Sequence, residues 1–318
     1  MTRQLWLAAP RGFCAGVERA TQVVTLALAR HGAPIYVRKQ IVHNTHVVAR
    51  LAAQGVVFVD EVDAIPVGSV VIFSAHGVSP SVRQAAADRQ LQIIDATCPL
   101  VSKVHREAQR LDCPIVLIGH RGHEEVEGTM GVARNAYLIE TPADVADLPD
   151  FGDQPIAWLS QTTLSVDETR STVAALRQRF PQLIDPPSDD ICYATQNRQT
   201  AARQLATRCQ LVIVVGSDNS SNSRRLVEVA QTAGTVAHLV DDAGDMDEAW
   251  LGAVDSVGVT SGASVPDDLV TEVLAWMTDH GWPPAVELAG PPETLHFTLP
   301  PALTSPYPPM TAASDSTT

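Results

Sequence analysis

Three short apolar runs recur along the chain, and each passes into small polar residues. They read VVIFSAHGVSP at 70–80, IAWLSQTTLS at 156–165 and SVGVTSGASVP at 256–266. A continuous apolar run of this length is typical of a buried parallel strand that runs into a loop. Each run is preceded by a polar loop, an amphipathic helical pattern, a short strand and an acidic helical turn. The pattern therefore predicts three copies of one structural unit.

A single cysteine stands at the beginning of each copy. Cys14, Cys98 and Cys192 are each followed by a helical pattern and then by an apolar strand. Strands that alternate with helices predict parallel sheets with right-handed crossovers. We therefore predict an α/β fold of three similar α/β domains with mostly parallel sheets.

The positions of these cysteines set the expected domain boundaries. We predict α/β repeats at 1–96, 97–190 and 191–300, packed as a trefoil with pseudo-threefold symmetry. The last residues, 301–318, are rich in Pro, Ser and Thr. Such a composition predicts a disordered tail without chemistry of its own.

Charge and targeting signals narrow the class of protein. The chain has 22 basic and 36 acidic residues and a net charge of −14, which argues against a nucleic-acid partner or an anionic membrane surface. No segment approaches the roughly 20 apolar residues of a membrane span. The N-terminal apolar run is too short for a signal peptide. Five scattered cysteines in such a chain are typical of reduced thiols, so we expect a cytoplasmic protein.

Aligning the three copies places polar side chains at equivalent positions. The groups that follow the second element are His43, His123 and the set Ser220, Ser221 and Asn222, and those that follow the last strand are His76, Thr162 and Ser264. Ligands of open parallel sheets bind beyond the carboxyl ends of the strands. If the three copies pack around one axis, the three cysteines meet at one point inside a ring of these polar groups.

Three converging cysteines suit a soft metal or an iron–sulfur cluster. A structural zinc site would normally use four ligands, paired at short spacing, and neither feature is present. A 4Fe-4S cluster held by three cysteines leaves one iron without a protein ligand, and this iron can act as a Lewis acid. For any one cysteine alone the simpler interpretation is burial. Cys113 and Cys209, each at the start of an apolar strand, are interpreted as structural.

The segment GHRGHEEVEG at 119–128 is the densest cluster of chemical groups in the sequence. It does not match the HExxH pattern of zinc proteases, and a solvated acidic helix start is the simpler interpretation. In the repeat alignment His123 faces the shared centre, so we predict that Glu125 is a proton donor there. Glu124 and Glu127 are predicted to be solvated.

The segment GSDNSSNSRRL at 216–226 follows a predicted strand and opens a helix. Exposed N–H groups and hydroxyls at a helix start can bind an anion, although Ser and Asn are also ordinary N-caps. Neither a GxxxxGK[ST] motif nor a GxGxxG turn is present, so the sequence gives no support for nucleotide binding by those routes.

As a set, these motifs resemble those of 4-hydroxy-3-methylbut-2-enyl diphosphate reductases, the last enzymes of the non-mevalonate isoprenoid pathway. The matching motifs are, in order, GFCAGVERA, VHN, FSAHGVSP, DATCPLVSKVH, IGHRGHEEVEG, SQTTLSVDET, DICYATQNRQ, VGSDNSSNSRRLVEVA and SGASVP. The resemblance covers about residues 5–299. The sequence departs from the family at Glu124, where a proline is common.

The resemblance implies a trefoil of three domains around a central cluster and a role for each site residue. It implies cluster ligation by Cys14, Cys98 and Cys192, with the substrate hydroxyl at the open iron and Thr162 close to that hydroxyl. It implies that the diphosphate is held by His43, His76, His123, Ser220, Ser221, Asn222 and Ser264 and that Glu125 relays a proton. Because the open iron is the one most easily lost, a 3Fe-4S form is also expected in some preparations.

The implied reaction is a reductive dehydroxylation of (E)-4-hydroxy-3-methylbut-2-enyl diphosphate to isopentenyl diphosphate and dimethylallyl diphosphate. Two electrons must come from outside, so a ferredoxin or flavodoxin is the expected partner. Other open-iron enzymes, such as a hydro-lyase or quinolinate synthase, would need no net electrons. An iron–sulfur sensor is a non-enzymatic alternative, but it would usually carry a basic DNA-binding element that this acidic chain lacks.

Overall fold

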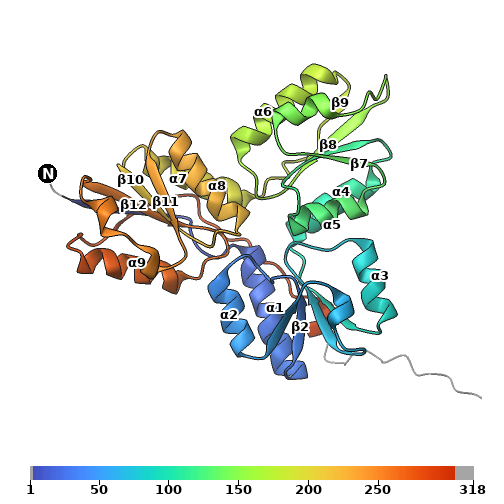
Figure 1. Ribbon diagram of the computed structural model, residues 1–318, viewed down its shortest axis with the longest axis horizontal. Helices are drawn as coiled ribbons and strands as arrows, with labels where there is room; N and C mark the ends of the chain where they lie inside the picture. The colour runs from blue at the N-terminus through green and yellow to red at the C-terminus, as the bar shows by residue number, and fades with distance from the viewer. Residues whose placement is uncertain (1–2, 305–318) are drawn as a thin grey trace, which may run out of the picture.

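Three parallel sheets with their helices form three lobes around a common centre (Figure 1). The structure is a computed structural model that describes residues 3–304. The predicted α/β class and the threefold arrangement of mostly parallel sheets are confirmed, since every recorded strand pair is parallel.

The first lobe contains a four-stranded sheet of order β3-β2-β4-β5. Its strands are β2 (Ile35–Arg38), β3 (Val56–Val59), β4 (Val70–Phe73) and β5 (Gln92–Asp95). Its helices are α1 (Ala15–His31), α2 (Thr45–Ala53), α3 (Pro80–Asp88) and the 3-10 turn η1 (Val62–Ala64). Buried side chains of α1, such as Val23 and Ala27, share a core with Ile35 and Ile72 of the sheet.

The second lobe repeats this plan in the order β7-β6-β8-β9. Its strands are β6 (Ile115–Ile118), β7 (Ala136–Ile139), β8 (Ile156–Ser160) and β9 (Leu183–Ile184). Its helices are α4 (Pro99–Arg110), α5 (Glu124–Val132), α6 (Val166–Arg179) and the 3-10 turn η2 (Pro142–Asp147). In the first lobe the chain passes from β2 to β4 through α2, β3 and η1. In the second lobe it passes from β6 to β8 through the matching elements α5, β7 and η2.

The third lobe has five strands in the order β11-β10-β12-β1-β13. Its strands are β1 (Gln4–Ala8), β10 (Leu211–Val215), β11 (Val236–Val240), β12 (Ser256–Ser261) and β13 (Val286–Leu288). Its helices are α7 (Tyr193–Ala206), α8 (Ser221–Thr232), α9 (Asp267–Asp279), η3 (Ala243–Asp245) and η4 (Glu248–Leu251).

The N-terminal strand lies in the third lobe, which corrects the predicted range 1–96 for the first repeat. Trp6 of β1 is opposite Gly258 of β12 on one side and Val286 of β13 on the other. β1 therefore takes the place that β5 and β9 hold in the other two sheets. The chain runs from β1 to Cys14, from β5 to Cys98 and from β9 to Cys192. Each of these three cysteines therefore lies where the chain leaves one lobe and begins the first helix of the next.

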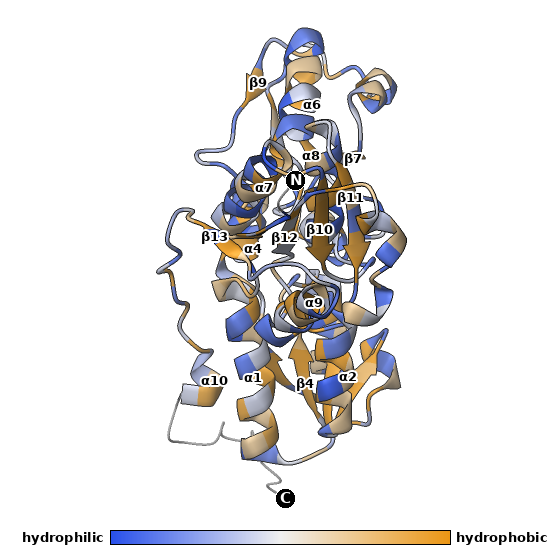
Figure 2. Ribbon diagram, turned by 90° about the vertical axis from the view of Figure 1, so that its left-hand side faces the viewer, coloured by the Kyte–Doolittle hydropathy of each residue, from blue (hydrophilic) through white to orange (hydrophobic). Residues whose placement is uncertain are grey.

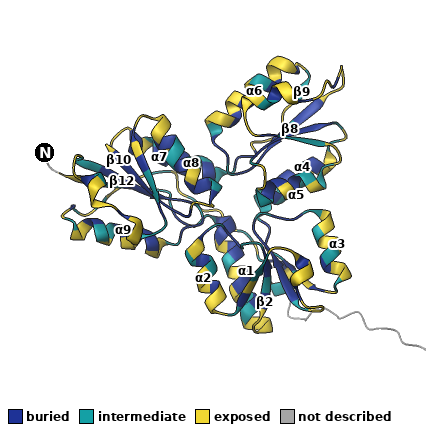
Figure 3. Ribbon diagram, viewed as in Figure 1, coloured by how far each residue is buried: buried dark blue, intermediate teal, exposed yellow. Residues whose placement is uncertain are grey.

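Burial follows the layers of each lobe. The strands are largely hydrophobic, whereas the helices alternate between hydrophobic and hydrophilic residues (Figure 2). The inner faces of the helices and the strands are buried, and the outward helix faces are exposed (Figure 3). Burial of these apolar faces, at about 25 cal/mol per Å² of apolar surface, stabilises each lobe around its own core.

The end of the described chain differs from the predicted tail. The segment after β13 runs along the side of the molecule to α1 (Figure 2), and residues 301–304 form the short helix α10 (Pro301–Thr304). Ala302 and Leu303 pack against the core of the first lobe, because they are apolar and α1 offers a matching face. The prediction of disorder is therefore wrong for 301–304, and the rest of the tail, 305–318, lies outside the described residues.

Among residues 3–304, no helix combines the length and the apolar character that are needed to cross a membrane.

Candidate functional site

All twelve candidate site residues line one cavity at the centre of the three lobes. They are Cys14, His43, His76, Cys98, His123, Glu125, Thr162, Cys192, Ser220, Ser221, Asn222 and Ser264. The cavity offers about 100 Å³ to the centres of water-sized molecules. It lies beyond the carboxyl ends of the parallel strands, where the three sheets face one another.

The three cysteines occupy equivalent positions at the starts of three helices. Each is the N-cap residue of its helix, α1 for Cys14, α4 for Cys98 and α7 for Cys192. Their backbone N–H groups donate to carbonyls of the loops that follow β12, β4 and β8, at 3.1, 2.9 and 3.1 Å respectively. The same loops carry Ser264, His76 and Thr162, so each cysteine is fixed against a loop that also supplies a polar side chain to the cavity.

The sulfur atoms face one another across a narrow centre. A Cβ atom on Gly16 would lie 2.7 Å from Cys98 Sγ and 3.8 Å from Cys14 Sγ, so glycine is required between these two sulfurs. Burial raises the pKa of Cys98 to about 12 and that of Cys192 to about 11. Buried thiols of this kind lose their protons when a metal binds, because the metal replaces the proton as the partner of the sulfur.

The three thiols form one set of soft ligands. Each comes from a different helix start and all three line the same cavity. Thiolates suit soft metals and iron–sulfur clusters.

The other two cysteines do not line the cavity. Cys209 is buried in the core beneath α7 and β10. Cys113 is half-buried two residues before β6 and contributes to no core cluster among the described residues. All five cysteines are free thiols.

Three histidines from two lobes form one side of the cavity. The rings of His43 and His76 stack with their centroids 4.1 Å apart, and His123 meets them edge-on at 5.3 and 5.7 Å. Both ring nitrogens of His43 are buried without a hydrogen-bond partner among the described residues. Burial, together with the neighbouring histidines, lowers the pKa of His43 to about 3 and that of His123 to about 2. Unpaired buried donors are costly, so this cluster is suited to an anionic ligand.

Glu124 is not solvated, which corrects the sequence prediction. Its Oε2 lies 2.9 Å from His76 Nδ1, and both side chains are largely buried. Burial alone would raise the pKa of Glu124, but the hydrogen bond and the charge of His76 hold it below its usual range. Glu127, one turn along the exposed side of α5, is exposed as predicted.

Glu125 is buried and has Thr162 as its hydrogen-bonding partner. The Thr162 N–H donates to Glu125 Oε1 at 2.6 Å, and the Thr162 hydroxyl donates to Oε2 at 2.9 Å. Burial raises the pKa of Glu125 to about 7, although both hydrogen bonds favour the charged form and act in the opposite direction. A carboxyl group with such a pKa can hold and release a proton near neutral pH.

The start of α8 supplies hydroxyl and amide groups from the third lobe. Ser220 caps the helix, and Ser221 accepts a hydrogen bond from the Thr163 hydroxyl at 3.0 Å. Asn222 Oδ1 accepts the Ala263 N–H at 2.8 Å, and the Ser264 hydroxyl donates to the His43 carbonyl at 2.7 Å. These contacts join the third lobe to the other two around the cavity.

Several lining residues were missed by the sequence analysis. Thr195 lies one turn after Cys192, and its hydroxyl is 3.1 Å from Cys192 Sγ. Thr163 follows Thr162, and both could have been proposed from the motif SQTTLS. Phe297 also lines the cavity, although it comes from the segment between β13 and α10. No local pattern in the sequence indicates that this segment returns to the centre.

The fold and the cavity define an α/β protein in which three repeats bring thiol, imidazole and hydroxyl groups to one central cavity. A family model described as LytB protein matches residues 5–278. The 4-hydroxy-3-methylbut-2-enyl diphosphate reductase of Cutibacterium acnes is 60% identical over 306 residues, which cover 95% of each chain. The same-named enzyme of Acidothermus cellulolyticus is 58% identical and covers 95% of this chain and 90% of its own.

A solved structure agrees with these relatives. The E-1-hydroxy-2-methyl-but-2-enyl-4-diphosphate reductase from Plasmodium falciparum superposes with a TM-score of 0.91 at 37% identity, covering 95% of this chain and 97% of that one. The chain therefore belongs to the LytB protein family, and it is an enzyme of the oxidoreductase class.

Proposed function

We propose that the protein catalyses the reductive dehydroxylation of (E)-4-hydroxy-3-methylbut-2-enyl diphosphate to isopentenyl diphosphate and dimethylallyl diphosphate. The observation that carries this proposal is the convergence of three cysteines, three histidines and the Glu125–Thr162 pair on one cavity. Relatives with the name of this reductase cover nearly the whole chain, which supports the same activity here.

Cys14, Cys98 and Cys192 would hold a 4Fe-4S cluster, also recoverable as a 3Fe-4S cluster. When bound, the cluster would supply electrons and an iron without a protein ligand, at which the substrate hydroxyl is positioned. The three cysteines that line one cavity and the glycine between two of their sulfurs support this assignment.

The histidines and the start of α8 would hold the diphosphate. His43, His76 and His123 offer ring N–H groups, and Ser220, Ser221, Asn222 and Ser264 offer hydroxyl and amide groups from the facing lobe. The unpaired nitrogens of His43 support a ligand at this position. An anion would also restore the charged state of histidines whose pKa burial lowers.

Glu125 and Thr162 would handle the proton at the substrate hydroxyl. Glu125 is mostly protonated below pH 7, because burial raises its pKa to about 7. Thr162 and Glu125 both line the cavity, and the Thr162 hydroxyl donates to the Glu125 carboxylate. Loss of a hydroxyl as water needs this proton, so the pair is suited to the leaving group.

The reaction needs two electrons from an external one-electron donor, and a ferredoxin or flavodoxin would supply them. The five free thiols suit a reducing compartment, and we propose a cytoplasmic location.

Purified anaerobically, the protein should oxidise reduced methyl viologen only when the allylic diphosphate is present, with two electrons consumed for each product. Chromatography should identify both isomeric diphosphates as products. Conversion of the substrate without viologen oxidation would indicate a hydro-lyase instead and would contradict the proposal. Cys113→Ala serves as the control, since Cys113 does not line the cavity.

A further inference from the structure

Each of the three cysteine helices carries one basic side chain in its second turn. They are Arg19 on α1, Lys103 on α4 and Arg198 on α7. Each side chain donates hydrogen bonds to main-chain carbonyls of the loop that precedes the next cysteine in the ring. Arg19 and Lys103 each lie five residues after their cysteine and Arg198 lies six residues after its own, so the three helices share this feature without strict equivalence of position.

Arg19 joins the helix of Cys14 to the loop before Cys98. Its Nη1 donates to Ala96 O at 3.0 Å and to Thr97 O at 3.1 Å. Its Nε donates to Thr298 O at 2.7 Å, in the segment between β13 and α10. Arg19 is almost fully buried, so these carbonyls satisfy a guanidinium that has little access to water.

Lys103 joins the helix of Cys98 to the loop before Cys192. Its Nζ donates to Ser188 O at 3.0 Å and to Asp189 O at 2.7 Å. It also pairs with the buried carboxylate of Asp190 at 3.3 Å. Lys103 is one of only two lysines in the chain, and its ammonium group offers three donors to these three oxygens.

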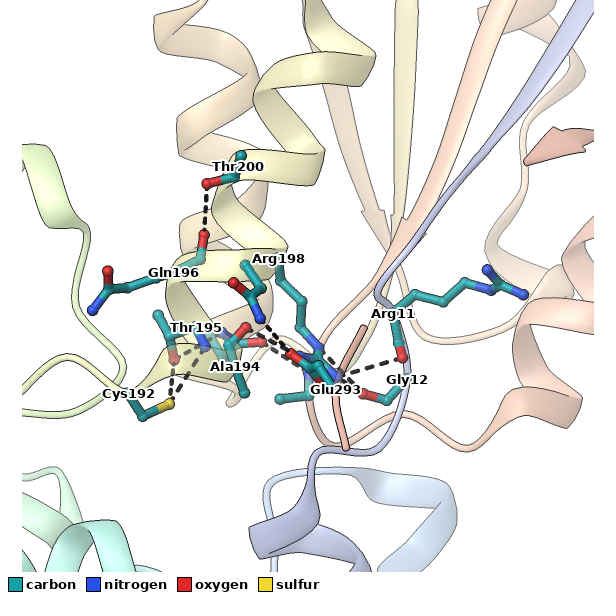
Figure 4. Close-up of polar contacts among 12 residues, drawn as sticks. Arg11, Gly12, Cys192, Ala194, Thr195, Gln196, Arg198, Thr200 and Glu293 are labelled. Atoms are coloured by element: carbon teal, nitrogen blue, oxygen red, sulfur yellow. Dashed lines mark hydrogen bonds and ion pairs between the residues drawn. The ribbon is translucent and has the colours of Figure 1, made fainter. Parts of the chain in front are cut away.

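Arg198 joins the helix of Cys192 to the loop before Cys14 (Figure 4). Its Nη2 donates to Gly12 O at 2.7 Å, and its Nη1 donates to Ala194 O at 3.0 Å. The side chain is fully buried and is neutralised by Glu293 at 3.0 Å. Glu293 belongs to the same segment that bonds Arg19, so this segment supports two of the three contacts.

The three contacts form a closed ring because of the fold. Each helix and the loop that its basic residue binds belong to the same lobe. One cysteine lies at the start of that helix, and the next cysteine lies at the end of that loop. Each contact therefore fixes the separation of two successive cysteines across one lobe. Charge-assisted hydrogen bonds are about twice as strong as neutral ones, which suits them to this purpose.

We propose that Arg19, Lys103 and Arg198 are positioning residues that set the triangle of the three cysteines. The proposal rests on the proposed function in one respect, since it takes these cysteines as the ligands of the cluster. The ring acts on the protein before a cluster is present, so its effect is measurable in the cluster-free chain as well.

Lys103→Met is the most informative variant, because Lys103 is partly exposed whereas Arg19 and Arg198 are buried, and circular dichroism should first show that the variant is folded. In the cluster-free protein, amide hydrogen exchange in residues 188–192 should become roughly tenfold faster, the change expected for one lost charge-assisted hydrogen bond. The loop at 95–97 should exchange as in the unaltered protein. Arg89→Met is the matched control, since Arg89 bonds the main-chain carbonyl of Ile65 and lies outside the ring.

In the cluster-loaded protein, Lys103→Met should lose iron to a chelator several-fold faster, and Lys103→Arg should restore most of the retention because it keeps the donors. Unchanged amide exchange at 188–192 in Lys103→Met would contradict the proposal that the basic residues position the cysteines. Exchange that is equally fast at 188–192 in the Arg89→Met control would also contradict it. An unaltered protein that binds no cluster would instead contradict the proposed function, while the exchange measurement would still decide on the ring.

Discussion

Thr162 donates two hydrogen bonds to Glu125, one from its backbone N–H at 2.6 Å and one from its hydroxyl at 2.9 Å. The carboxyl group is buried, and its pKa is raised to about 7 because burial outweighs both hydrogen bonds. This pair gives the cavity a proton donor whose position is fixed by the loop that also bonds Cys192.

Glu125→Gln should retain the cluster and the substrate but lose nearly all turnover. The amide has the same shape, and its oxygen can still accept one of the two Thr162 hydrogen bonds, yet it cannot release a proton. The loss expected for a removed general acid is about 10²- to 10⁴-fold in kcat. Iron content and viologen oxidation measured on the same preparation check this, and Glu127→Gln on the exposed side of α5 is the control. Turnover close to that of the unaltered enzyme would remove Glu125 from the proton path.

The pH profile should report the pKa of Glu125. A proton donor with a raised pKa is active below that pKa, so kcat/KM should fall as the pH rises above about 7. Thr162→Val removes one donor to the carboxylate, which destabilises the charged form and should move the falling limb upward by about one pH unit.

The matched control for the pH profile is Thr169→Val. The Thr169 hydroxyl is buried without a partner among the described residues, and Thr169 does not line the central cavity. If the kcat/KM of both variants falls at the same pH, Glu125 does not determine the pH dependence.

Binding of the diphosphate should be coupled to proton uptake. Burial lowers the pKa of His43 to about 3 and that of His123 to about 2, so both are neutral in the ligand-free cavity at pH 7. A bound anion favours the charged imidazolium and raises both pKa values. Calorimetric titrations with the substrate, in buffers of different ionisation enthalpy, should show uptake beyond that of the diphosphate itself.

His43→Gln should reduce this proton uptake, whereas His46→Gln should not, since His46 pairs with Asp242 outside the central cavity. Equal heats in all buffers would show that the histidines bind as neutral donors.

Glu124 should act on substrate binding through His76. Its carboxylate accepts from His76 Nδ1 at 2.9 Å and so fixes the orientation of the ring. Glu124→Gln should raise the KM roughly tenfold, the cost of one charge-assisted hydrogen bond, with little change in iron content. A rise in KM with kcat preserved separates this role from that of Glu125, where kcat should fall.

Periodicity and repetition in the sequence were enough to predict the three lobes and the twelve candidate residues that line the cavity. Cys14, Cys98 and Cys192 stand at matching helix starts, and a threefold repeat must bring matching positions together. The placement of β1 could not be predicted, because the apolar pattern of a strand does not specify which sheet it completes. The closure of the third sheet by β1 becomes visible only when the strand order is known.

Other features depend on contacts between residues distant in sequence. Glu124 is adjacent to the predicted acid, but its burial depends on His76 from another lobe. Phe297 and Glu293 reach the centre through an extended segment without regular structure, which carries no periodic signal. Arg19, Lys103 and Arg198 appear in the sequence as ordinary polar positions of amphipathic helices, and only the loops they bond reveal their relationship.

We propose that three cysteines from three repeats jointly hold one cluster. The most direct measurement is the iron and sulfide content per chain after anaerobic purification, compared between the unaltered protein, Cys14→Ser, Cys98→Ser, Cys192→Ser and Cys113→Ala. The unaltered protein and Cys113→Ala should each contain about four irons and four sulfides, and each of the other three variants should lose most of both. Full iron, sulfide and activity in any one of those three would contradict it.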